Sequence, residues 1–234
     1  MTFALPLVLV PGLLCSPRLY AAQVAALGAG RQVTIADHTR DDTMEAIAAR
    51  ILETAPERFA LAGLSMGGYI AFAMMRLAPE RIARLALLDT SARPDTDEQK
   101  AGRDKFIAMA QAGKLDDIVE TLTPKFLHPD HANDETFKSI IRIMAEETGA
   151  EAFVRQVKAI KSRADSRPLL VEIGCPTLVL VGDADAVTPP ELSKEIAADI
   201  LGAKLVVVPQ CGHLSTIEKP DAVNRALIEW LAGD

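Results

Sequence analysis

The chain is poor in cysteine, with only Cys15, Cys175 and Cys211 among its 234 residues. Three thiols are too few, and odd in number, for the disulfide framework that holds small secreted domains together. We therefore expect the chain to fold without disulfides in a reducing, cytoplasmic compartment.

Long apolar runs are also missing. No stretch of about 18 uninterrupted apolar residues occurs, so no transmembrane helix is expected. The apolar N-terminal segment, residues 1–14, is interrupted by Pro6 and Pro11 and lacks a basic region. We interpret this segment as containing a buried strand rather than a signal peptide.

The chain has fewer basic residues than acidic ones. The 25 Lys and Arg residues against 32 Asp and Glu residues give a formal net charge of −7. Because nucleic acids and anionic membranes bind basic surfaces, this balance argues against both as partners. Hydrophobic residues make up 49% of the chain, which excludes disorder as the dominant state. The length is ample for a substantial core.

Six short apolar runs alternate with helical patterns. Runs of this kind are typical of parallel strands that are covered on both faces. They lie at residues 5–10, 32–36, 59–64, 85–88, 177–181 and 204–208. The helical patterns lie at 44–52, 69–77, 191–200 and after Pro220, and Asp42 is expected to cap the first of them. The alternation predicts an α/β fold with a doubly wound, mostly parallel sheet of about six strands.

The alternation breaks between about Arg93 and Ser166, where helical patterns occur without a convincing strand. A crossover between parallel strands needs only a dozen or more residues, and this segment is much longer. We therefore expect a helical cap at about 93–166 that lies over the sheet's edge. The cap is inserted in a single domain spanning 1–234. Some of its apolar side chains are expected to roof an acyl pocket, the candidates being Phe106, Met109, Phe126, Leu127, Ile140 and Met144.

The segment Gly63-Leu64-Ser65-Met66-Gly67 matches G-x-S-x-G. It stands between an apolar strand and a helix, which is the context in which this pattern forms a nucleophile elbow. The two glycines suit a sharp turn that lifts the Ser65 hydroxyl above the sheet. A serine hydroxyl is a poor nucleophile without a base beside it.

A histidine can supply that base. His213 follows the last strand, at the sheet end where α/β folds place their sites. His38 also follows a strand, but it fits the chain order of nucleophile, acid and base less well. His128 and His131 lie in the cap segment, where we expect them to be solvated or to line a pocket.

Two aspartates after the fifth strand can supply the acid that orients His213. Either Asp183 or Asp185 can instead simply form a turn, and we favour Asp185 as the catalytic acid. For the oxyanion, the N–H groups of Leu13 and Met66 are the expected donors. Asp183, Asp185 and His213 are also a conceivable metal cluster, but the serine turn makes a metal superfluous, and no cofactor is expected.

This ordered set of motifs resembles the α/β-hydrolase superfamily, which includes esterases, lactonases, C–C hydrolases and haloperoxidase-like enzymes. The matching pieces are the Gly63–Gly67 turn, Gly182-x-x-Asp185, Gly212-His213, and Pro11-Gly12-Leu13 in place of the more usual His-Gly pair. The C-terminal third also resembles 3-oxoadipate enol-lactonases. The chain departs from many relatives in having no glycine between residues 30 and 63.

The resemblance implies a serine hydrolase that cleaves a small carboxylic ester, lactone or thioester through an acyl-enzyme. Ser65 is the expected nucleophile, His213 the base and Asp185 the acid. Two alternatives remain open at this point: a haloperoxidase-like or C–C hydrolase-like activity, and a ligand-binding receptor with little turnover. The expected partner is a small-molecule ester or lactone, and neither the substrate's chain length nor the oligomeric state follows from the sequence.

Overall fold

The computed structural model describes residues 4–233. In it, six parallel strands form one sheet in the order β2-β1-β3-β4-β5-β6. The chain adds β2 on one side of β1 and the remaining strands on the other, which confirms the predicted doubly wound α/β fold. The strands are β1 (Leu7–Val10), β2 (Val33–Ile35), β3 (Phe59–Leu64), β4 (Ile82–Leu88), β5 (Thr177–Gly182) and β6 (Lys204–Val208).

Strand β4 begins three residues before the apolar run that predicts it. Arg84 interrupts the apolar pattern there, yet it pairs with Ala60 of β3 in the sheet. Its guanidinium donates a hydrogen bond to the carbonyl oxygen of Trp230 at 3.0 Å, so its charged end reaches a polar partner. Because Arg84 is an isolated polar residue inside β4, the strand predicted from the apolar run was too short.

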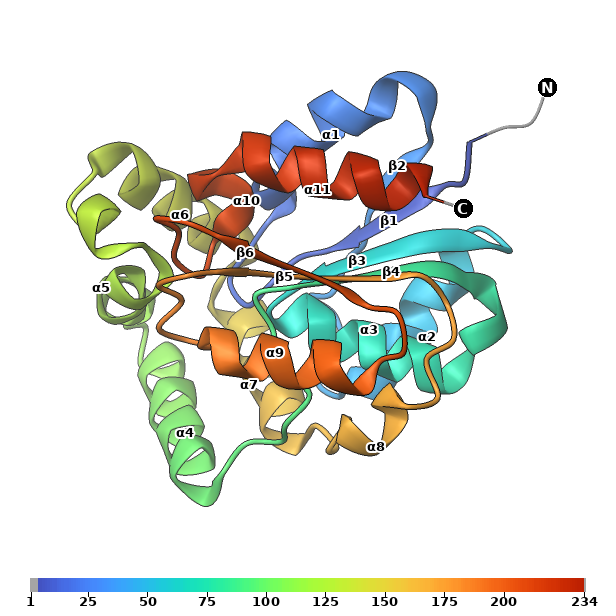
Figure 1. The fold of residues 1–234 in the computed structure, drawn as a ribbon. Coiled ribbons are helices and arrows are strands. Elements are labelled where there is room, and N and C mark those ends of the chain that lie inside the picture. The colour runs from blue at the N-terminus through green and yellow to red at the C-terminus, as the bar shows by residue number, and fades with distance from the viewer. Residues whose placement is uncertain (1–3, 234) are drawn as a thin grey trace.

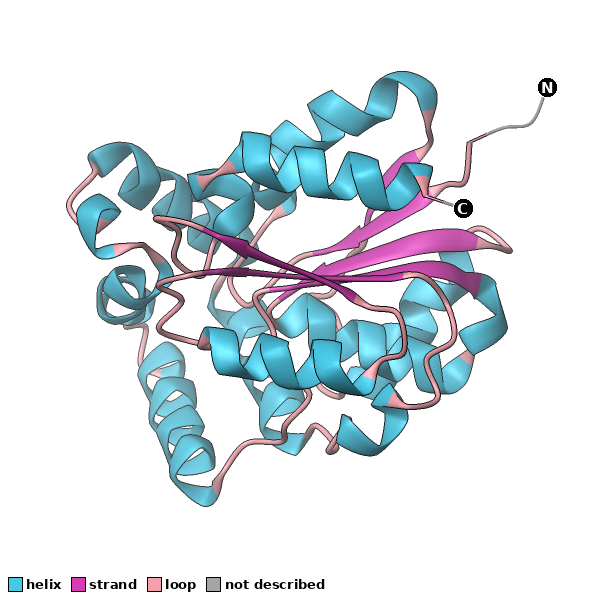
Figure 2. Cartoon of the chain, viewed as in Figure 1, coloured by secondary structure: helices cyan, strands magenta, loops and turns pink. Residues whose placement is uncertain are grey.

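Helices cover both faces of the sheet (Figures 1 and 2). One face carries α1 (Ala21–Leu27) and α11 (Pro220–Ala232), and the other carries α2 (Met44–Thr54), α3 (Met66–Leu77) and α9 (Pro190–Asp199). Alternate side chains of β1 enter different clusters: Leu7 and Leu9 pack on the first face, and Val8 and Val10 on the second. Burial on both faces explains why the strands are almost continuously apolar.

The prediction that Asp42 caps α2 is wrong. Thr43 is the N-cap, because its extended backbone lets Oγ1 accept a hydrogen bond from the Ala46 N–H at 3.2 Å. Helix α3 begins at Met66, three residues earlier than predicted. Gly67 and Gly68 lie in its first turn, and their low helix propensity conceals that start in the sequence.

Five helices, and no strand within the described residues, separate β4 from β5. They are α4 (Asp97–Gln111), α5 (Leu115–Phe126), α6 (Glu135–Thr148), α7 (Ala150–Ser162) and α8 (Arg167–Leu170). Figure 1 shows α4, α5 and α6 beyond the carboxyl ends of the strands. The short elements are η1 (Pro17–Tyr20), η2 (Gly28–Gly30), η3 (Pro79–Arg81), η4 (Pro129–His131) and α10 (Ser215–Glu218). Within residues 4–233, every helix is too short or too polar to cross a membrane.

Candidate active site

Ser65 occupies a strained turn between β3 and α3. Its backbone lies at φ 55° and ψ −114°, a conformation that non-glycine residues rarely adopt. Two hydrogen bonds from the neighbouring strand hold the turn: the Ser65 N–H donates to the Leu88 carbonyl at 2.9 Å, and Thr90 Oγ1 donates to the Ser65 carbonyl at 2.8 Å. Strain of this kind persists where the surroundings enforce it, as they often do at functional sites.

The two glycines of the turn are required by close backbone contacts. A Cβ atom on Gly63 would lie 2.2 Å from the carbonyl oxygen of Gly67, and one on Gly67 would lie 2.0 Å from that of Val10. Neither distance is compatible with a side chain. The G-x-S-x-G pattern is therefore explained by packing of α3 against β3 and β1.

His213 lies in the loop after β6, with its ring directed at the Ser65 hydroxyl. Its Nε2 atom is 2.9 Å from Ser65 Oγ. The ring stacks on Phe126 of α5, with centroids 5.8 Å apart, and the His213 N–H donates to the Phe126 carbonyl at 2.9 Å. Helix α5 thus fixes the histidine, and only 2% of His213 is exposed.

Asp185 completes the arrangement behind the histidine. Its Oδ2 atom is 2.8 Å from His213 Nδ1 and accepts a second hydrogen bond from Thr188 Oγ1 at 2.8 Å. Its Oδ1 atom accepts from the N–H groups of Val187 and Thr188 at 2.8 and 2.9 Å. A continuous chain of hydrogen bonds therefore joins Ser65, His213 and Asp185.

Burial and charge oppose each other in this pair. Burial acts to raise the pKa of Asp185, but the charge of His213 and the four donors outweigh it and hold that pKa below its ordinary value. Burial likewise acts to lower the pKa of His213, and the adjacent Asp185 carboxylate reverses this and raises it. The environment thus favours the charged forms of both groups.

The other candidate residues form hydrogen bonds with partners outside the triad. Asp183 is exposed, and its Oδ1 atom accepts from the Cys211 N–H at 3.1 Å, a bond within the loop. His131 Nδ1 lies 2.8 Å from Glu218 Oε2, and His128 Nδ1 accepts a hydrogen bond from the Asp130 N–H.

Asp89 is a buried acid at this site that sequence reasoning missed. It follows β4 directly, at φ 46°, and is fully buried. Its Oδ1 accepts from the Gly182 N–H at 3.0 Å, and its Oδ2 lies 2.5 Å from Ser215 Oγ. Burial, reinforced by the charge of Asp185, raises the pKa of Asp89 well above its ordinary value. Its place at a strand end was the signal available in the sequence.

The residues expected to bind the oxyanion lie in the loop after β1 and at the start of α3. Leu13 borders the cavity above Ser65, and Met66 is the first residue of α3. The neighbouring Leu14 lies at φ 57°, and its N–H donates to Gln156 Oε1 of α7 at 3.2 Å. His38 supports this loop, with Nε2 2.9 Å from the Gly12 carbonyl oxygen, and forms no hydrogen bond with Ser65 within the described residues.

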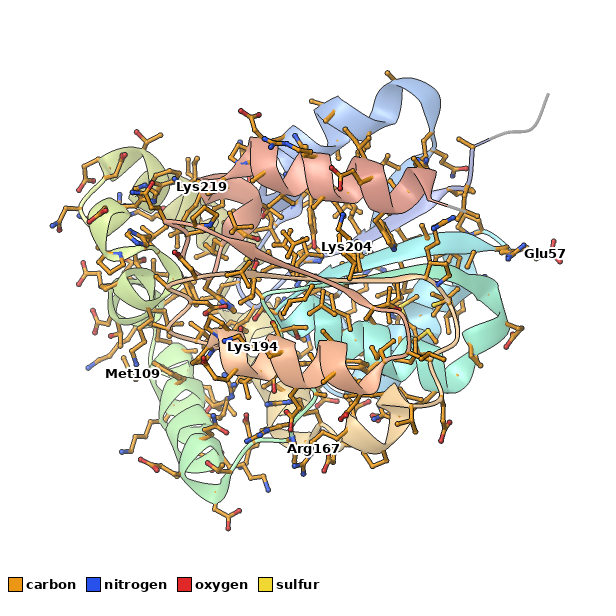
Figure 3. The ribbon with its side chains drawn as sticks, in the orientation of Figure 1. Glu57, Met109, Arg167, Lys194, Lys204 and Lys219 are labelled. Carbon is orange, nitrogen blue, oxygen red and sulfur yellow. The ribbon has the colours of Figure 1, made fainter. Side chains whose placement is uncertain are left out.

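A cavity of about 240 Å³ opens above Ser65 and His213. Of the six apolar side chains expected to roof a pocket, only Phe126 borders it, and Leu122 and Ile160 join it from α5 and α7. Met109 of α4, labelled in Figure 3, is absent from the cavity wall. It packs instead against the hydrophobic cluster that contains Leu7 and Leu9.

The two cysteines nearest the site are both buried. Cys15 also borders the cavity, and burial raises its pKa to about 12. Cys211 is fully buried two residues before His213, and burial raises its pKa above the ordinary range as well. Both thiols therefore stay in the unreactive protonated form at neutral pH.

Comparison with known proteins assigns the family. The model of the alpha/beta hydrolase family matches residues 7–226. An esterase from Thermogutta terrifontis, solved with malate bound, superposes with a TM-score of 0.88 at 33% identity, over 97% of this chain and 89% of that one. The enol-lactonase from Burkholderia xenovorans LB400 gives a TM-score of 0.85 at 26% identity, over 98% and 92%.

A relative of a different description is similar to the same degree. A protein of Mycobacterium tuberculosis described as a non-heme bromoperoxidase is 30% identical over 200 residues, which cover 81% of this chain and 74% of that one. Relatives at this distance share the fold and the family but differ in the activities described for them, so the reaction has to be argued from this chain's own site.

Proposed function

The chain belongs to the alpha/beta hydrolase family, and from this premise we propose that it is a serine hydrolase that cleaves a small carboxylic ester, lactone or thioester. The observation that carries the proposal is the hydrogen-bonded chain from Ser65 Oγ through His213 to Asp185, which ends at the cavity. A nucleophile beside a base that is itself oriented by an acid is the arrangement that acyl transfer needs.

The reaction has two halves. Ser65 Oγ attacks the substrate carbonyl carbon while its proton passes to His213 Nε2. The oxyanion accepts hydrogen bonds from the N–H groups of Leu13 and Met66. His213 then protonates the leaving oxygen or sulfur, and the acyl group stays on Ser65. Water attacks this ester with His213 as the base, which releases the acid and restores Ser65.

The electrostatics support this cycle. Asp185 is held as a carboxylate by its four donors, and an anionic acid stabilises the imidazolium that forms when His213 takes the proton. The His213 ring has little freedom to rotate, because Phe126 stacks on it and Asp185 holds Nδ1. The base is therefore preorganised toward Ser65.

The test is the loss of turnover on removal of the nucleophile. With 4-nitrophenyl esters of two- to six-carbon acids, Ser65→Ala should lower kcat by about 10⁴-fold or more, because triad members act as a unit. A fluorophosphonate should label the wild type at Ser65. The matched control is Ser139→Ala on the exposed face of α6, which should keep full activity and full labelling.

Two other results would redirect the proposal. Saturable binding of ester analogues without turnover by the wild type would favour a receptor role. The similarity to the described bromoperoxidase supports a second candidate, bromination in the presence of bromide and the oxidant hydrogen peroxide. Ser65-dependent bromination without measurable ester hydrolysis would favour that activity over the esterase.

A further inference from the structure

The candidate active site carries positive charge in a chain that is acidic as a whole. Arg103 of α4 and Lys125 of α5 border the same cavity as Ser65 and His213. Among the described residues that line this cavity, none is acidic. The whole chain has a formal charge of −7, so two cations without a lining acid are a local departure from its average.

Arg103 is held in place by a buried carboxylate. Its Nε donates to Asp95 Oδ2 at 3.0 Å, and the Asp95 side chain is fully buried. Arg163 Nη1 donates to the other oxygen, Oδ1, at 2.6 Å. One carboxylate thus faces two guanidinium groups, and the cluster keeps an excess of one positive charge.

The two arginines of this cluster differ in whether their guanidinium N–H donors remain free to bind a ligand. Arg163 is committed to the fold, because its guanidinium also lies 4.2 Å from the centroid of the Tyr69 ring and its side chain is only 8% exposed. Arg103 is 22% exposed at the cavity, and its two terminal nitrogens form no hydrogen bond within residues 4–233. The free donors of the cluster therefore belong to Arg103.

Lys125 provides a second, independent cation. It lies in the last turn of α5, is exposed, and forms no ion pair within the described part of the chain. Its neighbour Phe126 is the residue that stacks on His213. Helix α5 therefore fixes the base with one residue and brings a charge to the cavity with the next.

We propose that Arg103 and Lys125 form a carboxylate subsite, so that the substrate is an ester, lactone or thioester with a carboxylate at the end remote from the scissile bond. A guanidinium with free terminal N–H groups matches a carboxylate in a bidentate geometry, and the ammonium adds attraction without that directionality. The inference rests on the proposed hydrolase function and gives its substrate class.

The experiment compares substrates that differ only in this charge. Monomethyl esters of the four- to seven-carbon dicarboxylic acids are paired with the same esters in which the free acid is a primary amide. At pH 8 the wild type should show a kcat/KM about 10-fold or more higher for the acid than for the amide of the best length. Raising the salt concentration should reduce this ratio, because it screens a partly exposed ion pair.

Variants assign the preference to the two cations. Arg103→Gln should reduce the acid-to-amide ratio by about 10-fold, and Lys125→Gln by about 3-fold, because its charge is more exposed. The matched control is Lys105→Gln, which removes one charge from α4 outside the cavity and should leave the ratio unchanged. Lys125→Gln alters an exposed side chain, so it keeps the test valid if Arg103→Gln folds poorly.

The outcomes separate the subsite from the hydrolase proposal. Ser65-dependent cleavage of the amide esters without any preference for the acids would overturn the subsite and leave the hydrolase standing. If no ester is cleaved, calorimetry with glutarate and the wild-type protein decides. Saturable binding of glutarate that is lost in Arg103→Gln or Lys125→Gln, and kept in Lys105→Gln, would support the subsite. If the wild type does not bind glutarate, the subsite proposal is overturned.

Discussion

Two buried aspartates beside His213 have opposite electrostatic environments. Asp185 accepts four hydrogen bonds and faces His213, which together lower its pKa despite burial. Asp89 is fully buried beside Asp185, and its pKa is raised by burial first and by that neighbouring charge second. Burial and charge thus shift the pKa values of the two carboxyl groups in opposite directions, that of Asp185 down and that of Asp89 up.

The assignment of the acid can be tested by a matched pair of substitutions. Asp185→Asn should misorient the His213 ring and lower kcat by about 10³- to 10⁴-fold, as loss of the acid does in other triads. Asp183→Asn should cost far less, because Asp183 is exposed and accepts only from the Cys211 N–H. The measurement is kcat at pH 8, with folding checked by circular dichroism. A dead Asp183→Asn beside an active Asp185→Asn would reverse the assignment.

The residues brought together at Ser65 could be predicted because each has a marker in the sequence. Ser65 stands in a turn pattern, and Asp185 and His213 follow strands in an order typical of this architecture. Asp89 also follows a strand, but that signal is weak, since a single Asp after a strand is also a common turn residue. Its importance depends on burial and on the approach of Gly182 and Ser215, which only the fold determines.

Helix α7 supports the loop that is expected to bind the oxyanion. Gln156 is fully buried, with Oε1 accepting from the Leu14 N–H and Nε2 3.0 Å from His38 Nε2. Burial lowers the pKa of His38, which keeps its ring neutral at pH 7. The cap and the loop after β1 are thereby joined by one side chain, next to the proposed donor Leu13.

We expect removal of this link to affect catalysis more than binding. Gln156→Met keeps the length of the side chain but leaves the Leu14 N–H unpaired, which should cost about 1–3 kcal/mol of stability. A looser loop should lower kcat by about 10-fold, a fraction of the 10²- to 10³-fold that full loss of an oxyanion donor costs. Gln111→Met, at the exposed end of α4, is the control. A change in KM alone would contradict the positioning role.

The apolar spacing of the sequence predicts some of the cap helices but not all of them. The helices around Phe106, Ile141 and Phe153 could be predicted from their apolar spacing, whereas α5 was not recognised as a separate helix. Pro124 lies inside α5, and a proline there normally argues against a helix. The failure to predict α5 matters for the site, because α5 supplies Phe126 and two further residues of the cavity wall.

The wall of α5 should set the acyl length that the cavity accepts. Leu122→Phe adds volume to a cavity of about 240 Å³ and should move the preferred acyl chain toward shorter acids by one or two carbons. Met109→Phe adds volume on α4 away from the cavity and should leave the preference unchanged. Relative kcat/KM across the 4-nitrophenyl ester series measures the shift. An unaltered profile in Leu122→Phe would show that the acyl group lies elsewhere.

The site as a whole is assembled from distant parts of the chain. The loops after β1, β3, β5 and β6 meet at one end of the sheet, as parallel topology requires, and α4, α5 and α7 contribute side chains to the cavity there. The sequence predicts this meeting through the order of its strands. It does not predict which cap side chains reach the cavity, because helix packing angles decide that.

Asp89 also links the stability of the entire fold to pH. Below the pKa of the unfolded chain, about 4, both states hold this proton and burial of the neutral acid carries no ionisation cost. Above that pH the unfolded chain releases the proton while the folded protein keeps it, because its pKa is raised. The contribution of Asp89 to the unfolding free energy therefore falls by up to about 1.4 kcal/mol per pH unit until the folded pKa is reached.

Asp89→Asn should remove this dependence. The amide is a neutral isostere that can accept from Gly182 and donate to Ser215, and it carries no titrating proton. Relative to the wild type, the variant should gain unfolding free energy as the pH rises above about 4, by up to about 1.4 kcal/mol per pH unit until the folded pKa of Asp89 is reached. Urea unfolding at pH 5, 6 and 7 measures the trend, with Ser139→Ala, an exposed substitution that changes no titrating group, as the control that should show a constant difference. A constant difference in Asp89→Asn as well would mean that Asp89 is ionised in the folded protein.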